Sequence, residues 1–185
     1  MSLLVAGLVL FLAVHLIPSV PRLRAALVER LGAMSYRGVF SAVVLLSLVA
    51  VVWGYSRAPF EEVYAPPAWG HRASMILVPI ALVLFAAANM PTRIRALVQH
   101  PMLLGLLLWA LAHLLSNGEV RSVVLFGGFA LFAAVEIVSA VLRGKRPPAE
   151  PAPRIARDIA AVVGGLVVAG LLAGFHGTLF GEPVM

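Results

Sequence analysis

The sequence predicts an all-α fold, a polytopic membrane bundle of about six transmembrane helices with both termini on the non-cytoplasmic side. Of the 185 residues, 62% are hydrophobic and 12% are charged, whereas soluble domains use roughly 25% charged residues. The mean hydropathy is +1.01. Six apolar runs alternate with short polar connections, none long enough for a soluble domain. We therefore expect one transmembrane domain over residues 1–185.

Each apolar run predicts a spanning helix, and the runs cover residues 3–18, 39–55, 74–89, 101–116, 123–142 and 159–180. Several fall short of the ~20 residues that a bilayer requires. We expect these helices to lengthen at their ends or to thin the bilayer locally. The first run has no basic leader and no small-residue cleavage site, so it is expected to remain as a helix.

The connections carry their own patterns. PRLRAALVERL (21–31) spaces Leu23, Leu27 and Leu31 four residues apart with arginines beside them, which is typical of a helix lying on the cytoplasmic membrane surface or of an ordinary helical linker. RPPAEPAP (146–153) predicts an extended connection. GLLAG (170–174) in the last helix is a small-xxx-small pattern that permits close approach of a neighbouring helix. The alternative is that it occurs by chance in a helix rich in glycine and alanine.

The basic residues set the orientation. Connections one, three and five hold eleven of the fourteen lysines and arginines, and such connections face the cytoplasm. The formal charge of +6 therefore reflects topology, and we expect membrane lipid and no nucleic acid as a partner. Tyr55, Tyr64 and Trp69 fall near the outer interface. Cysteine is absent, which excludes disulfides, iron–sulfur clusters and cysteine nucleophiles.

Ionisable side chains at membrane depth cost ~2.5–3.5 kcal/mol each at the bilayer centre and so invite functional hypotheses. His113 shares a helical stripe with Gly105, Trp109 and Asn117. The glycine would leave room for a flat ligand and the tryptophan would form an aromatic wall. Ligation of haem iron is one interpretation of His113, and an interhelical hydrogen bond is the other.

A second histidine is needed for six-coordinate iron, and His15 and His176 are the two available. Glu136 either pairs with Arg143, seven residues later on the same face, or accepts from the second nitrogen of His15. We expect His176 to make an interfacial hydrogen bond at the outer end of its helix. His100 precedes Pro101, so it is expected at the cytoplasmic rim, capping a helix.

These residues carry a resemblance. HPMLLGLLLWALAHLLSNGE (100–119), together with FLAVHLIP (11–18), NMPTRIRALVQHP (89–101) and HGTLFGEPV (176–184), resembles the NnrU family of bacterial membrane proteins over nearly the whole chain. The resemblance implies a multi-pass protein of the bacterial inner (cytoplasmic) membrane and a role in denitrification, through nitrite or nitric oxide metabolism.

The family is also similar to the plant 15-cis-ζ-carotene isomerase, an integral membrane enzyme that uses haem. That similarity implies haem b bound by His15 and His113 and a lipophilic polyene as substrate. From the helical stripe and the spacing of the residues, we expect Gly105, Trp109 and Glu136 around such a cofactor.

Other functions stay open. HPMLLG (100–105) matches the HPxxxG element of membrane methyltransferases, but the further groups that those enzymes need are not evident. The main alternative to a haem-dependent isomerase or redox sensor is a non-enzymatic accessory protein supporting a nitrogen-oxide reductase or transporter. A transporter is disfavoured because no paired repeat is visible.

Overall fold

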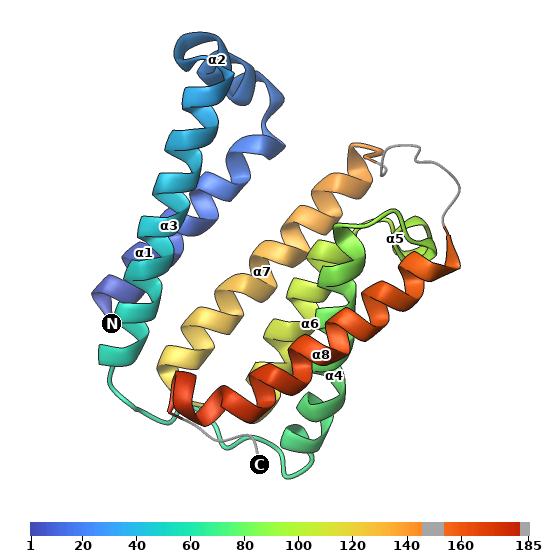
Figure 1. The fold of residues 1–185 in the computed structure, drawn as a ribbon. Coiled ribbons are helices and arrows are strands. Elements are labelled where there is room, and N and C mark those ends of the chain that lie inside the picture. The colour runs from blue at the N-terminus through green and yellow to red at the C-terminus, as the bar shows by residue number, and fades with distance from the viewer. Residues whose placement is uncertain (146–153, 182–185) are drawn as a thin grey trace. The chain divides into compact units, whose positions relative to one another are not determined.

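A computed structural model describes residues 1–145 and 154–181. Within these ranges the regular elements are helices (Figure 1), and one isolated bridge joins Glu62 and Glu119. The elements are α1 (Ser2–Leu16), η1 (Ile17–Ser19), α2 (Pro21–Leu31), α3 (Ala33–Arg57), α4 (Gly70–Ala88), α5 (Arg93–Val98), α6 (Pro101–Ser116), α7 (Val120–Leu142) and α8 (Ile155–Phe180). The predicted all-α class is confirmed.

Five of the helical segments are long and apolar enough to cross a membrane, and α6 is a sixth, shorter apolar helix. The predicted lengthening occurs in α3, α7 and α8, which have 25, 23 and 26 residues. α6 keeps its 16 residues and is only ~24 Å long, less than the ~30 Å hydrocarbon core. The protein is therefore a multi-pass membrane protein of about six spans, one of them short.

The chain forms two compact units, Met1–Ala65 with Gly118–Phe129, and Pro66–Asn117 with Ala130–Met185. α7 begins in the first unit and continues into the second. A single transmembrane domain over the whole chain stays a prediction, as does the non-cytoplasmic orientation of both termini.

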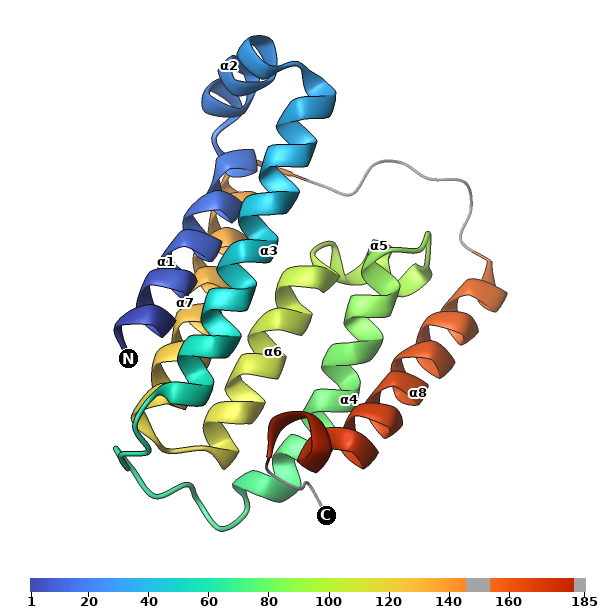
Figure 2. The same ribbon diagram turned by 60° about the vertical axis from the view of Figure 1, so that its left-hand side comes forward.

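In the first unit α1 and α3 run antiparallel and lie side by side (Figure 2). Glycines allow this approach. A Cβ atom on Gly7 would lie 2.8 Å from the backbone nitrogen of Val51, and one on Gly54 would meet the backbone of Leu4. Apolar burial gives helices little reason to associate within lipid, so close backbone packing of this kind replaces it.

In the second unit α4 packs against both α6 and α8, and glycines again stand at the contacts. A Cβ atom on Gly105 of α6 would lie 3.0 Å from the Phe85 ring of α4. A Cβ atom on Gly165 of α8 would lie 2.7 Å from the backbone nitrogen of Val83. α4 is therefore the central helix of this unit.

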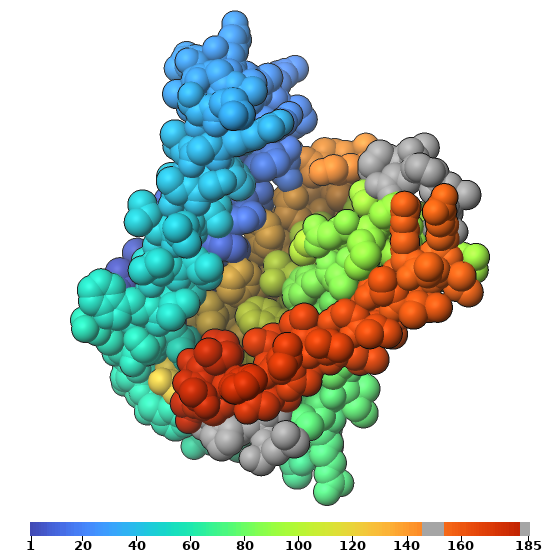
Figure 3. Space-filling model, in the orientation of Figure 1, coloured from blue at the N-terminus to red at the C-terminus, as the bar shows by residue number. Residues whose placement is uncertain are grey.

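Two connections between the long helices are themselves helical, and only the first was predicted. The segment 21–31 forms α2, as predicted, with Pro21 in its first turn, where a missing N–H costs nothing. α2 ends at Gly32, whose φ of +80° is a conformation that favours glycine. α2 lies at the end of the α1–α3 pair where α1 ends and α3 begins (Figure 3). α5 was not predicted; it starts at Thr92, whose hydroxyl accepts from the Arg95 N–H at 3.0 Å.

The small-residue pattern at 170–174 does not bring helices together among the described residues. Gly170 and Gly174 are exposed, and nothing lies within 4 Å of a Cβ placed on either. The contact of α8 with α4 is made one to two turns earlier, at Gly165. The predicted extended connection at 146–153 lies outside the described residues.

Replacing Gly54 with alanine should destabilise the protein by at least ~1–3 kcal/mol, because the added methyl group overpacks the α1–α3 contact. Gly38 on the same helix is the matched control. A Cβ there meets nothing within 4 Å, so Gly38→Ala should be neutral or stabilising by up to ~1 kcal/mol. Thermal unfolding in mild detergent compares the two variants, and equal midpoints would contradict the packing role of Gly54.

Candidate functional site

His15 lies on α1 with a defined hydrogen-bond arrangement. Its Nδ1 is 2.7 Å from the carbonyl oxygen of Phe11. A carbonyl oxygen only accepts, so Nδ1 carries the hydrogen and, in the neutral ring, the lone pair is on Nε2. The imidazole stacks on the Phe11 ring at 4.2 Å and meets the Phe40 ring edge-on at 5.7 Å. The Phe11 carbonyl therefore fixes the tautomer of the neutral ring.

The hydroxyl of Tyr36 is a buried polar group beside the same aromatic rings. The Tyr36 ring lies 6.1 Å from that of Phe40, and its hydroxyl oxygen is buried with no hydrogen-bond partner among the described residues. Phe129 packs edge-on against Phe11 at 5.6 Å. We call these five residues the His15 cluster: Phe11, His15, Tyr36, Phe40 and Phe129. A buried hydroxyl without a partner is costly, so it marks a place where a polar group is missing.

His113 on α6 repeats the arrangement of His15. Its Nδ1 is 2.8 Å from the carbonyl oxygen of Trp109, four residues earlier, which again assigns the lone pair of the neutral ring to Nε2. The Trp109 ring lies 4.8 Å from the imidazole, so the predicted aromatic neighbour is present. The side-chain amide of Asn117 donates to the His113 carbonyl at 2.8 Å.

The open space expected beside Gly105 is filled. The Ala81 carbonyl oxygen and the Phe85 ring, both on α4, would each lie 3.0 Å from a Cβ at that position. The glycine serves helix packing because a small residue lets α6 approach α4. Any ligand of His113 must therefore approach from another side of α6.

Glu136 pairs with Arg143, as one of the two sequence interpretations predicted. The Arg143 Nη2 is 3.9 Å from the Glu136 Oε2, and the carboxylate is almost fully buried. The other interpretation gave Glu136 the second nitrogen of His15. His15 donates from Nδ1 to the Phe11 carbonyl, and a contact of Glu136 with its other nitrogen stays a prediction.

Two other histidines considered in the sequence analysis, His100 and His176, are in the second unit. His100 precedes α6, but its side chain makes no capping hydrogen bond to a described residue, and its Nε2 is buried without a described partner. The predicted side-chain cap is therefore not formed. His176 lies 4.9 Å from the Phe180 ring and close enough to His113 for an electrostatic interaction.

The structure thus brings together His113, Trp109 and His176 in the second unit, while His15 stands in the first. Within residues 1–145 and 154–181, no group of three or more histidine, aspartate or glutamate side chains is placed to hold a metal ion. The imidazoles of His15 and His113 each engage Nδ1 within their own helix.

A buried polar cluster that the sequence analysis missed lies in the first unit; we call it the Glu119 cluster: Tyr55, Glu119, Arg121 and Ser122. Ser122 Oγ donates to Glu119 Oε1 at 2.6 Å, so the Tyr55 hydroxyl, 2.7 Å from Ser122 Oγ, must donate to the serine. Arg121 Nε lies 3.6 Å from the same carboxylate oxygen. Glu119 and Ser122 are only 7% and 0% exposed, so the carboxylate is satisfied almost entirely by protein groups.

Backbone pairing fixes this cluster at the rim of the unit. The Val120 N–H donates to the Glu61 carbonyl at 2.8 Å, and the Val63 N–H donates to the Gly118 carbonyl at 2.9 Å. Burial, and then the charge of Glu119, raise the pKa of the nearby Tyr64. The cluster therefore fastens the end of α3 and the following loop to the start of α7. Its signal in the sequence is the charged GEVRS (118–122) between two apolar helices.

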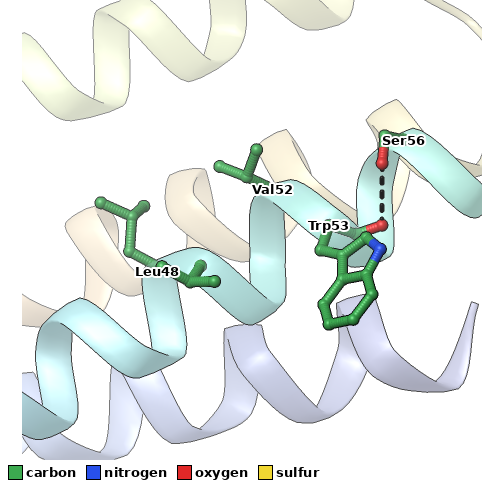
Figure 4. A pocket seen from close by; sticks show the side chains of 5 residues that line it. Leu48, Val52, Trp53 and Ser56 are labelled. Atoms are coloured by element: carbon green, nitrogen blue, oxygen red, sulfur yellow. Dashed lines mark hydrogen bonds between the residues drawn. The ribbon is translucent and has the colours of Figure 1, made fainter.

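A shallow apolar depression lies along α3 (Figure 4). All of its lining residues are on that one helix: Leu48, Val49, Val52, Trp53 and Ser56. The one hydroxyl, that of Ser56, donates to the Trp53 carbonyl at 2.9 Å. No charged group or histidine lines it, so it is typical of a lipid-facing helix surface and not of a catalytic site.

Comparison with known proteins gives one match. Residues 3–184 match the protein family described as "NnrU protein". No curated protein and no solved structure matches the chain.

Ser122→Ala should destabilise the protein by ~1–3 kcal/mol, because it removes the hydrogen bond to the buried Glu119 carboxylate and the nearer acceptor of Tyr55. The Tyr55 hydroxyl is then left with Glu119 Oε1 at 3.4 Å. Ser56→Ala is the control, since that hydroxyl is exposed and bonds only within its own helix. Thermal unfolding in detergent measures both. A Ser122→Ala variant as stable as Ser56→Ala would show that the Glu119 cluster does not hold the first unit together.

Proposed function

The chain belongs to the NnrU family, and we propose that it binds haem b within the membrane through Nε2 of His113 and of His15. One observation carries this proposal. Both imidazoles donate Nδ1–H to a backbone carbonyl four residues earlier, at 2.8 and 2.7 Å. Metal-ligating histidines commonly have such a partner on the other nitrogen, which fixes the tautomer and orients the ring.

The surroundings of each imidazole suit a flat, mainly apolar group with a polar edge. The rings of Phe11, Phe40 and Phe129 gather around His15, and that of Trp109 lies against His113. The unsatisfied Tyr36 hydroxyl could donate to a carboxylate at the polar edge of such a group. The residues present therefore fit haem, with Tyr36 as the polar contact on the His15 side.

Bound haem would supply an iron centre able to bind nitric oxide or to act on an unsaturated lipid-soluble molecule. The chain itself holds the imidazoles in one tautomer and excludes water with aromatic side chains. We propose that the protein acts in the bacterial inner membrane, in nitrite or nitric oxide metabolism. Cis–trans isomerisation of a lipophilic polyene is a second use of the same site, supported by the resemblance to the plant isomerase.

A non-enzymatic accessory role is the second candidate. It is favoured by the fact that three of the candidate site residues have partners without a cofactor: Glu136 pairs with Arg143, and the imidazoles of His15 and His113 bond within their own helices. In that role the histidines only stabilise the bundle, and the protein supports a nitrogen-oxide reductase or transporter.

Haem content separates the two candidates. We expect protein purified in mild detergent, after haem supply during expression, to contain stoichiometric haem b with sharp α and β bands when reduced. His113→Ala and His15→Ala should each lose or alter these bands. His71→Ala, on the exposed first turn of α4, is the control and should retain them. A colourless wild-type protein would favour the accessory role.

Tyr36→Phe tests the polar contact without removing the ring. Losing one hydrogen bond to a charged group should weaken haem binding by ~1.5–3 kcal/mol, or roughly 10- to 150-fold in the dissociation constant. Tyr64→Phe, in the loop after α3, should have no effect. Haem titration of the stripped protein, followed by its Soret absorbance, gives both constants, and an unchanged value for Tyr36→Phe would exclude this residue from the site.

A further inference from the structure

α2 presents an apolar stripe that the described protein does not cover. Leu23, Leu27 and Leu31 are four residues apart and so lie along one face of the helix. Leu23 and Leu31 are 46% and 44% exposed. Leu27, between them, is half-buried. The two outer leucines therefore form an apolar face that an apolar environment outside the protein would cover.

Arginines flank this stripe on both sides. Arg24 and Arg30 lie three residues before and after Leu27, which at ~100° per residue places them about 60° to either side of it. Both are exposed, and neither forms an ion pair with a described residue. Glu29 is the single acidic residue of α2, so the face around the leucines has a net positive charge.

The chain path puts this helix at a membrane surface. α2 follows the end of α1 and precedes the start of α3. These two helices are antiparallel candidate membrane spans, and α2 lies at the end of the pair where they are joined (Figure 3). A helix with leucines on one face and basic residues beside them binds at the boundary between headgroups and acyl chains.

We propose that α2 is a binding surface for anionic phospholipid, with Arg24 and Arg30 contacting headgroup phosphates while Leu23, Leu27 and Leu31 enter the acyl boundary. Charge complementarity selects the anionic lipid. A zwitterionic headgroup carries a compensating positive charge, whereas two unpaired guanidinium groups favour a net negative one. The proposal does not depend on haem binding.

The test is the preference for phosphatidylglycerol over phosphatidylcholine, measured by native mass spectrometry of lipid-bound protein or by fluorescent-lipid competition. The Arg24→Gln/Arg30→Gln variant should lose roughly 5- to 25-fold of this preference, about fivefold per arginine. Arg57→Gln/Arg72→Gln carries the same charge change at exposed positions outside α2 and should keep the wild-type preference. An equal loss in both variants, or in neither, would overturn the proposal.

Two further measurements distinguish the contributions. Leu23→Ser/Leu31→Ser should weaken binding of both lipids while keeping the preference for the anionic one, and loss of the preference alone would overturn the assigned roles. Raising the salt concentration should reduce the preference because exposed charges are screened. Inorganic phosphate at millimolar concentration should not displace the lipid; displacement would show a free-anion site instead. Unchanged thermal unfolding midpoints confirm that the variants are folded.

Discussion

The lipid environment imposes the constraint on which the rest of this structure depends, since every backbone N–H and C=O in the hydrocarbon must be satisfied by the protein itself. Helices meet this requirement within one segment, but in lipid they gain little by burying apolar side chains against one another. They associate through close backbone contacts, and the glycines at positions 7, 54, 105 and 165 supply them. Each buried glycine contact therefore has a role that a hydrophobic core would have in a soluble protein.

The same constraint governs polar side chains at depth. Ser47 donates to the carbonyl of Val44 at 2.8 Å, and His15 and His113 donate to the carbonyls of Phe11 and Trp109. A serine is then satisfied, because its hydroxyl has a single hydrogen to donate. An imidazole differs, because donating from Nδ1 leaves a second nitrogen that carries a lone pair. Satisfying the lipid constraint thus prepares a histidine for ligation and explains why histidine, more than serine, signals function at this depth.

Much of the fold could be predicted because hydrophobic length and helical spacing are properties of short segments. The six apolar runs became helices, and the Glu136–Arg143 pair, seven residues apart on one helix, was readable from spacing. Contacts between distant segments were not readable. Gly105 could border a void or another helix, and only the position of Phe85 decides between them. The Glu119 cluster was missed because Tyr55 and Ser122 are 67 positions apart.

Some of the described polar groups have hydrogen-bond or ionic partners within the protein, and others do not. The first kind contributes to stability, and two groups of the second kind support the binding proposals. Glu119 and Ser122 have partners within the protein, so their contribution ends at holding helices together. The Tyr36 hydroxyl has no described partner, and Arg24 forms no described ion pair. A buried hydroxyl without a partner calls for a ligand, whereas a solvated arginine beside exposed leucines calls for a surface. These two groups therefore support two different proposals, a bound cofactor among the rings of the His15 cluster and lipid headgroups at α2.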